Sequence, residues 1–402
     1  MKKNVPILII TVVLLCVLTL GVDASYSGVV QRVQSALSLP GSWAIGEDGL
    51  TQLGNGSVFA LTANGLVQLE SPVVTSPPGT LTGVGGGGLL FDNGRVRVAA
   101  DKFKVGLRYY YSERRDSSME VAYLENSVGS GYAFGWYDGS RNFVQAGPDA
   151  VTDETQLTIV PLGGTGVGVY STKTNELLYS SAATGRTSYL AIHPLCNTGE
   201  AVTWFAKTRY CGDFAYADLG NGKLTVVNIV NVERYVMGVC AGEMGASFPL
   251  EALKAQAVAA RTYAMYYVHN GAYTVPFGFD LTADDYSQVY LGYTTSQTLI
   301  SAAEETRNQY LTYNGQIIEA LFSAADGGET LNSEDVFASA MPYLRGFEDP
   351  YEASAWTRGR FGHGVGLSQW GAYAMANTFH YNYKDILGFY YTSVGLSYGY
   401  MQ

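Results

Sequence analysis

The pattern of apolar and polar positions changes character along the chain. Between residues 102 and 160 it consists of short runs bounded by turn residues, which is typical of β-strands. Residues 224–230 (LTVVNIV) form a largely apolar run that predicts a buried strand. Residues 249–268 are rich in Ala and Leu, and Ser247 lies two residues before the proline that opens this run. They predict a long capped helix with proline in its first turn.

Two further helices are predicted at residues 368–377 and 296–310. Together these elements indicate an α+β fold, with a β-rich N-terminal part and a C-terminal domain in which one long helix lies beside a sheet. A chain of 402 residues suggests two or three domains. We expect a small β or α/β module at residues 101–165 and one continuous domain at residues 170–402.

The N-terminus has the features of an export signal. Lys2 and Lys3 precede an apolar run at residues 5–20, and small residues follow it. This run is near the lower length limit for a membrane-spanning helix, so residues 1–24 are either a cleaved signal peptide or a retained anchor. Residues 25–100 are polar and glycine-rich, which indicates a β-type segment and a linker. We expect the protein outside the cytoplasm, with membrane contact only through the N-terminal segment.

The charge balance limits the choice of ligands. A formal net charge of −11 disfavours nucleic acid as a partner. The same charge repels any polyanion at long range, so an anionic ligand has to be held by a local cluster of cations.

Cysteine and histidine show no metal-binding pattern. Three cysteines, Cys196, Cys211 and Cys240, follow the signal segment. Either Cys196 and Cys211 form a disulfide, or all three are small buried thiols. The four histidines are dispersed, and we predict neither a metal nor another cofactor.

One carboxylate has an unusual setting for an acidic residue. Glu243 lies in a small, apolar, glycine-flanked segment, residues 238–247, just before the long predicted helix. A carboxyl group that is poorly hydrated has its pKa raised toward neutrality, as a general acid requires. The alternative is a carboxylate near a helix start that is stabilised by the N-terminal dipole.

Two cations share one face of the long helix. Lys254 and Arg261 are seven residues apart, and their neighbours are small or apolar. Either they hold an anionic group of a substrate, or they pair with acidic residues elsewhere in the fold.

Two other segments have side chains that suit a sugar. Residues 362–371 (GHGVGLSQWG) combine glycines that let a backbone approach a ligand with polar and flat side chains. The aromatic residues at 126–137 either stack on sugar rings or belong to the core.

Several segments together resemble the SpoIID/LytB family, over roughly residues 200–402. This family includes a membrane-anchored sporulation enzyme, a lytic transglycosylase of peptidoglycan strands stripped of stem peptides, and proteins described as amidase enhancers. The segments that carry the resemblance are 226–235 (VVNIVNVERY), 242–244 (GEM), 247–263 (SFPLEALKAQAVAARTY), 287–290 (SQVY), 327–330 (GGET), 342–345 (PYLR), 362–372 (GHGVGLSQWGA) and 385–387 (DIL).

The resemblance implies both an activity and a site. It implies that Glu243 is the acid/base of a glycan-cleaving enzyme, and that one carboxyl suffices because the muramyl C6 hydroxyl replaces water. The implied partners are peptidoglycan glycan strands and, for a non-catalytic enhancer as the alternative, a cell-wall amidase. The implied substrate-binding positions are Lys254, Arg261, Tyr263, His363, Ser368, Gln369 and Trp370.

Two details of this expectation depend on particular side chains. Lys254 and Arg261 would hold the lactyl carboxylate that stripped strands expose on each muramic acid. Some relatives carry His and Cys for a structural zinc near the segment that is residues 322–328 here. Those ligand types are absent from this segment, so the expectation is that no zinc binds.

Overall fold

The computed structural model describes residues 94–184, 189–271 and 278–401, together with the backbone of four strands between residues 42 and 68. The chain splits into two compact units, residues 1–79 and 80–402. The predicted signal segment lies outside the described residues. None of the helices that the structure describes is long and apolar enough to cross a membrane.

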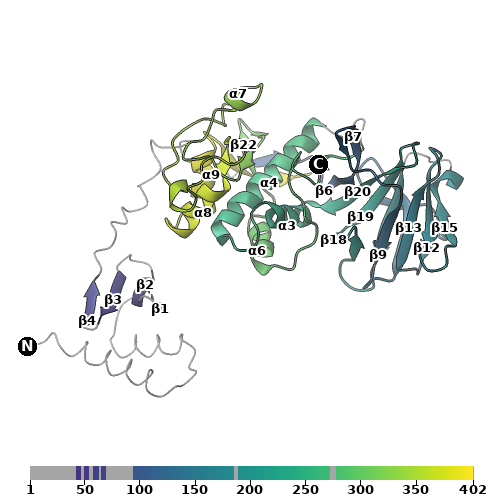
Figure 1. The fold of residues 1–402 in the computed structure, drawn as a ribbon, viewed down its shortest axis with the longest axis horizontal. Helices are drawn as coiled ribbons and strands as arrows, with labels where there is room; N and C mark the ends of the chain where they lie inside the picture. Colours follow the sequence, from purple (N-terminus) through teal and green to yellow (C-terminus); the bar gives the residue numbers. More distant parts are fainter. Residues whose placement is uncertain are drawn as a thin grey trace, which may run out of the picture. The chain divides into compact units, whose positions relative to one another are not determined.

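The first unit contains one antiparallel sheet with strands in the order β1-β2-β3-β4 (Figure 1). Its strands are β1 (Ser42–Gly46), β2 (Gly49–Leu53), β3 (Val58–Thr62) and β4 (Gly65–Gln68).

Two sheets pack face to face in the second unit. The eight-stranded sheet has the order β11-β10-β16-β19-β20-β6-β21, with β12 beside β10, and the six-stranded sheet has the order β15-β14-β13-β9-β17-β18. Phe205 of the six-stranded sheet lies 6.0 Å from Phe214 of the eight-stranded sheet, between ring centroids. The strands are β6 (Lys102–Arg108), β9 (Ala122–Glu125), β10 (Gly131–Tyr137), β11 (Phe143–Gln145), β12 (Val151–Thr152), β13 (Gln156–Pro161), β14 (Val167–Ser171), β15 (Leu177–Ser180), β16 (Leu190–Leu195), β17 (Val202–Phe205), β18 (Thr208–Cys211), β19 (Asp213–Asp218), β20 (Leu224–Asn231) and β21 (Leu281–Thr282).

The helices of this unit lie together beside the strands (Figure 1). The central helix α4 (Leu250–Asn270) packs against α3 (Val232–Glu243), α6 (Gln297–Glu305), α8 (Gln369–Asn377) and α9 (Tyr383–Tyr390). Its alanine-rich sequence allows this close packing from several sides, and α4 is buried along most of its length.

A small four-stranded sheet lies beside α4, in the order β23-β22-β26-β5. Its strands are β5 (Arg95–Arg97), β22 (Gln309–Tyr313), β23 (Gln316–Ile317) and β26 (Gly395–Tyr400). Short elements complete the unit: β7 (Tyr110–Ser112) with β8 (Arg115–Asp116), β24 (Phe322–Ser323) with β25 (Leu367–Ser368), α7 (Ser333–Val336), and the 3-10 turns η1 (Ser181–Thr184) and η2 (Glu352–Ser354).

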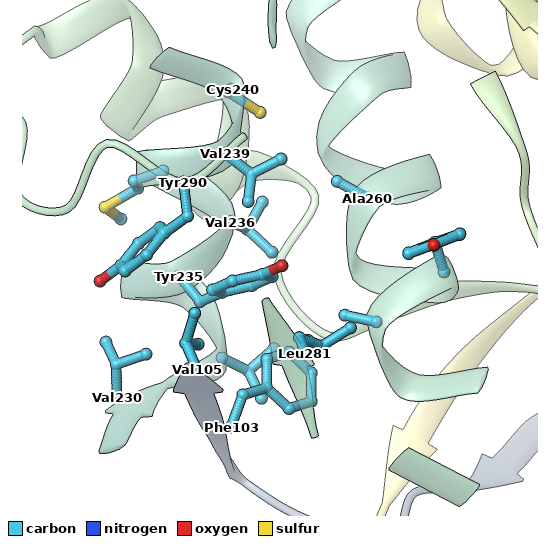
Figure 2. Close-up of a cluster of buried hydrophobic side chains, with 14 of the residues drawn as sticks. Phe103, Val105, Val230, Tyr235, Val236, Val239, Cys240, Ala260, Leu281 and Tyr290 are labelled. Carbon is cyan, nitrogen blue, oxygen red and sulfur yellow. The ribbon is translucent and has the colours of Figure 1, made fainter. Parts of the chain in front are cut away.

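An aromatic core fixes α3 between the strands and α4. Tyr235 lies 5.3 Å from Phe103 and 5.1 Å from Tyr290, between ring centroids. Figure 2 shows this cluster, in which Val236 and Val239 of α3 face the helix that carries Ala260, and Leu281 and Phe103 lie below Tyr235. Packing on both sides holds α3, and therefore Glu243 at its end, in a fixed position.

The α+β class is confirmed, with helices and sheets in the same unit. The buried strand predicted at residues 224–230 is β20, and the predicted helix at residues 368–377 is α8. The aromatic segment 126–137 largely forms β10, whose first five residues are buried, so these side chains belong to the core. The boundary predicted near residue 165 falls inside one sandwich, because strands from both sides of it share each sheet.

Two helix predictions need correction. The helix at residues 296–310 ends at Glu305, because Asn308 adopts a φ of 61° and the next residues form β22. The long helix begins at Leu250 with Pro249 as its N-cap, and no side chain caps it, so Ser247 does not have the predicted role. The three cysteines are free, and Cys211 and Cys240 are buried, so the alternative without a disulfide is correct.

Candidate active site

Glu243 is the last residue of α3, a position that two glycines make possible. A Cβ on Gly238 would lie 2.5 Å from the carbonyl oxygen of Gly292, and one on Gly242 would lie 2.3 Å from that of Val289. These glycines are one turn apart, so one face of α3 is bare and the segment 289–292 lies directly against it. This contact brings the backbone N–H of Val289 to the end of the helix.

The Glu243 carboxylate accepts one hydrogen bond on each oxygen. The N–H of Val289 donates to Oε1 at 2.8 Å, and Nε2 of Gln369 donates to Oε2 at 3.2 Å. The same Gln369 amide also donates to Oε1 of the buried Gln256 on α4, at 3.4 Å. Val289 and Gln369 thus fix the orientation of this half-buried carboxyl group, and Gln256 in turn orients Gln369.

Burial raises the pKa of Glu243 above its usual value, although its two hydrogen bonds partly oppose the shift; the charge of Asp285 raises it further. The position at the C-terminal end of α3 acts in the same direction, because this end of a helix carries a partial negative charge. The alternative of a carboxylate stabilised at a helix start is therefore wrong. The arrangement suits a group that has to be protonated before it reacts.

The start of α8 positions Gln369. Ser368 is the N-cap of α8, where its Oγ accepts the N–H of Gly371 at 3.0 Å and donates to Oε2 of Glu352 at 2.5 Å. Glu352 is buried and also accepts the backbone N–H groups of Asp326 and Gly327 at 2.7 and 2.8 Å. Ser368 is thus a positioning residue, not a substrate contact, since it is fully buried.

Asp326, Asp349 and Glu352 form a buried carboxylate cluster. Each offers one oxygen, and these oxygens lie within 4.8 Å of one another, so among the described residues this is the group that could hold a metal ion. Burial and the neighbouring carboxylates raise the pKa of Asp326 to about 9, and burial also raises the pKa of Asp349. Asp349 and Glu352 already accept hydrogen bonds from backbone and hydroxyl groups, among them Tyr390 Oη at 2.6 Å. A proton on Asp326 would reduce the repulsion between these carboxylates.

An aromatic wall stands beside Gln369. Trp370 stacks on Trp356 at 5.4 Å and 20°, and Phe248 lies 5.1 Å from Trp370, between ring centroids. Phe361 extends the stack and is 64% exposed, which leaves aromatic surface open to a ligand. Arg358 is also exposed and lies 5.3 Å from the Trp356 ring centroid. Flat rings beside a cation suit an anionic sugar.

Sequence reasoning identified Trp370 but missed four members of this wall. Phe248 lies inside the recognised segment 247–263 but was not singled out, whereas Trp356, Arg358 and Phe361 lie just before the segment 362–372. A signal was present, because residues 356–361 (WTRGRF) combine aromatic and cationic side chains immediately before the glycine-rich segment.

The two cations of α4 do not serve as predicted. Arg261 is fully buried and pairs with Glu233, with Nη2 to Oε2 at 2.5 Å. Lys254 lies between Glu251 and Glu305, with Nζ 2.6 and 2.7 Å from their oxygens. The alternative of pairing with acidic residues is therefore correct, and neither side chain is left to hold a substrate anion.

Tyr263 and His363 also lie mainly in protein contacts. Tyr263 is two turns beyond Gln256 on the same face of α4, only 7% exposed, and its ring packs on Tyr267 and Phe322. His363 accepts the N–H of Val365 at 3.0 Å, and burial lowers its pKa, so it is neutral at pH 7. A role for either side chain in substrate binding remains a prediction.

The glycines of the segment 362–371 have a packing role. A Cβ on Gly366 would lie 2.1 Å from the carbonyl oxygen of Leu321, and one on Gly362 would lie 2.7 Å from Cβ of Ser323. They let this segment lie against its own neighbours. The expectation that they admit a ligand is therefore not needed to explain them.

Comparison with known proteins identifies the segment that carries the site. A sequence model of the family described as Stage II sporulation protein matches residues 220–313, which include α3, α4 and the Val289 segment. An uncharacterised protein of Brachyspira hyodysenteriae is 46% identical over 127 residues, which are 31% of this chain and 34% of that protein. In Bacillus subtilis, a protein named Amidase enhancer is 43% identical over 121 residues (30% of this chain, 16% of that one), and Stage II sporulation protein D is 38% identical over 139 residues (31% and 40%).

The matches are local. The chain thus covers between 16% and 40% of the length of these three relatives. Within the matched part lie Glu243, its donor Val289, and Gln256, which accepts a hydrogen bond from the second donor, Gln369. Residues 220–313 of this chain are thus similar to the Stage II sporulation protein family, and parts of the chain are similar to relatives named Amidase enhancer and Stage II sporulation protein D.

Proposed function

We propose that this protein is a lytic transglycosylase that cleaves peptidoglycan glycan strands outside the cytoplasm, with Glu243 as its single acid/base. The observation that supports it is the setting of Glu243: a poorly hydrated carboxyl group, hydrogen-bonded by Val289 and Gln369, near an aromatic wall. Sporulation or cell-wall remodelling is the process that the family names suggest.

The mechanism needs one carboxyl group to act twice. Protonated Glu243 donates its proton to the glycosidic oxygen as the bond to the muramyl C1 breaks. The resulting carboxylate then takes the proton of the muramyl C6 hydroxyl, whose oxygen closes on C1 to give a 1,6-anhydro ring. The proton lost in the first step is thus regained in the second, and no water is consumed. The hydrogen bonds from Val289 and Gln369 stabilise the carboxylate between the two steps.

The aromatic wall and Arg358 are the proposed substrate contacts. Trp370, Trp356 and Phe361 offer ring faces for sugars. Arg358 replaces Lys254 and Arg261 as the cation for the lactyl carboxylate, because it is exposed and lies at this wall. A preference for strands stripped of stem peptides would follow, since stripping exposes that carboxylate.

The decisive experiment is mass spectrometry of products from amidase-treated and untreated peptidoglycan. We expect anhydromuramyl fragments from the wild type, mainly from the treated wall, and none from Glu243→Gln. Thermal unfolding of both proteins checks that the variant is folded. Products with a reducing muramic acid would instead indicate hydrolysis, and Asp285, whose charge reaches Glu243, would be the second carboxylate to replace.

A non-catalytic enhancer of a cell-wall amidase is the second candidate, because one relative carries the name Amidase enhancer. In that case wild type and Glu243→Gln would bind the wall equally, release no anhydromuramyl fragments, and stimulate a purified amidase to the same extent.

A further inference from the structure

A hollow lies on the six-stranded sheet, and none of its lining residues belongs to the site around Glu243. Its volume is about 350 Å³. The side chains that characterise it are Tyr123, Glu125, Gln156, Thr172, Trp204 and Lys207.

The strand register places two aromatic rings in water on this face. Trp204 of β17 is paired with Glu125 of β9, and Tyr123 lies two residues before Glu125, so all three side chains share one face of the sheet. The intervening residues Leu124 and Phe205 are 1% and 2% exposed in the sandwich core. Tyr123 and Trp204 are 59% and 40% exposed. One face of these strands is therefore buried in the sandwich core, and the opposite face presents aromatic side chains to solvent.

Two cations accompany the exposed rings. Lys207 lies in the tight turn between β17 and β18, with a positive φ of 68°, and Arg209 is the cross-strand partner of Trp204, with its guanidinium 5.5 Å from that ring centroid. Within the described part of the chain, neither forms an ion pair with a carboxylate. The protein as a whole carries a net charge of −11, but these two cations make this face locally complementary to an anion. The exposed rings beside them favour an anion that also has flat faces.

We propose that this face is a second glycan-binding site, which holds an anionic sugar strand with its rings on Tyr123 and Trp204 and a carboxylate near Lys207. The apolar faces of sugar rings pack on aromatic side chains, and the exposed Gln156 and Thr172 offer hydrogen bonds to hydroxyl groups. The identity of the strand as peptidoglycan glycan rests on the proposed function. The site would keep a long strand bound while its cleaved end leaves the site at Glu243.

The test measures binding of the full chain in the Glu243→Gln background, which prevents turnover. We expect Trp204→Ala to weaken binding to amidase-treated peptidoglycan about tenfold, which is about 1.4 kcal/mol. Leu177→Ala is the matched control, because Leu177 is 52% exposed on β15 of the same sheet and does not line the hollow. Equal binding by Trp204→Ala, Leu177→Ala and the parent protein would overturn the proposal.

A second arm isolates the role of charge. Lys207→Ala should weaken binding to stripped glycan but leave binding of neutral chitooligosaccharides unchanged, whereas Trp204→Ala should weaken both. The proposal is also contradicted if both variants bind both ligands as tightly as the parent protein does. These readouts do not depend on cleavage, so a wild type that releases no anhydromuramyl product would refute the proposed activity and leave the binding result standing.

Discussion

Helix α3 carries a carboxylate at each end, and the two have opposite environments. Glu233 in the first turn is buried and bound by the guanidinium of Arg261, near the positive end of the helix. Glu243 in the last turn is half-buried, meets two neutral donors and lies at the negative end. A carboxylate paired with a buried guanidinium serves as its counter-ion, whereas one whose pKa is raised by burial can exchange a proton. The surroundings of the two side chains thus make Glu233 a structural residue and Glu243 a candidate catalytic acid, although both lie on the same twelve-residue helix.

The strongest test of the comparison removes the proton-exchanging group. Glu243→Gln keeps the shape of the side chain and should lower the rate of glycan cleavage by at least about 10² to 10⁴, the usual contribution of general acid–base catalysis. The free energy of unfolding should change little, because no cation is left unpaired. Substantial residual cleavage in a product assay would show that another group supplies the proton.

The opposite result is expected at the other end of the helix. Glu233→Gln leaves the Arg261 guanidinium buried without its anion, which should destabilise the protein by about 3 to 5 kcal/mol in urea unfolding. The double variant Glu233→Leu/Arg261→Met removes both charges and should recover most of that loss. If the double variant is no more stable than Glu233→Gln, the ion pair is not the cause.

A third carboxyl group sharpens the comparison, because the buried carboxyl of Asp326 forms no ion pair with any described residue, and Arg360 reaches only its backbone carbonyl. The pKa of Asp326 in the folded protein, about 9, lies above its pKa in the unfolded chain. Its contribution to the free energy of unfolding is therefore complete below the unfolded pKa and is lost as the pH rises through about 9. We expect the stability of the wild type to fall between pH 6 and pH 9 by up to about 1.4 kcal/mol per pH unit. Asp326→Asn should flatten this slope, while Asn at the exposed position Asp153 should not. Identical slopes for all three proteins would show that Asp326 does not hold a proton.

The smallest effect is expected where the cation is exposed. Arg358→Ala should raise KM for stripped glycan about fivefold with kcat nearly unchanged, because an exposed ion pair contributes up to about 1 kcal/mol. Lys254→Met is the control, since Lys254 is already paired and should leave KM unaltered. A larger change in KM from Lys254→Met than from Arg358→Ala would reverse the assignment.

The sequence was sufficient for the elements whose signal is local. A few neighbouring residues are enough to recognise the apolar run of β20, the alanine-rich helix α4 and the isolated Glu243. It was insufficient wherever a partner lies far along the chain. Arg261 and Lys254 look like free cations until Glu233 and Glu305 are placed beside them. The same holds for Val289 and the wall residue Trp356, because only folding brings their segments to the active site.

The outermost strands of the small sheet have a consequence for biogenesis. β5 at residues 95–97 pairs in parallel with β26 at residues 395–400, so residues near both ends of this unit meet in one ladder. Such distant contacts raise the contact order and slow folding, since nearly the whole chain has to be available before they form. Residues 395–400 have to be synthesised before this ladder can form, so the small sheet is completed late in folding. Proteolytic removal of residues 395–400 would leave β5 without its partner, which makes β26 a sensitive point for proteolytic quality control.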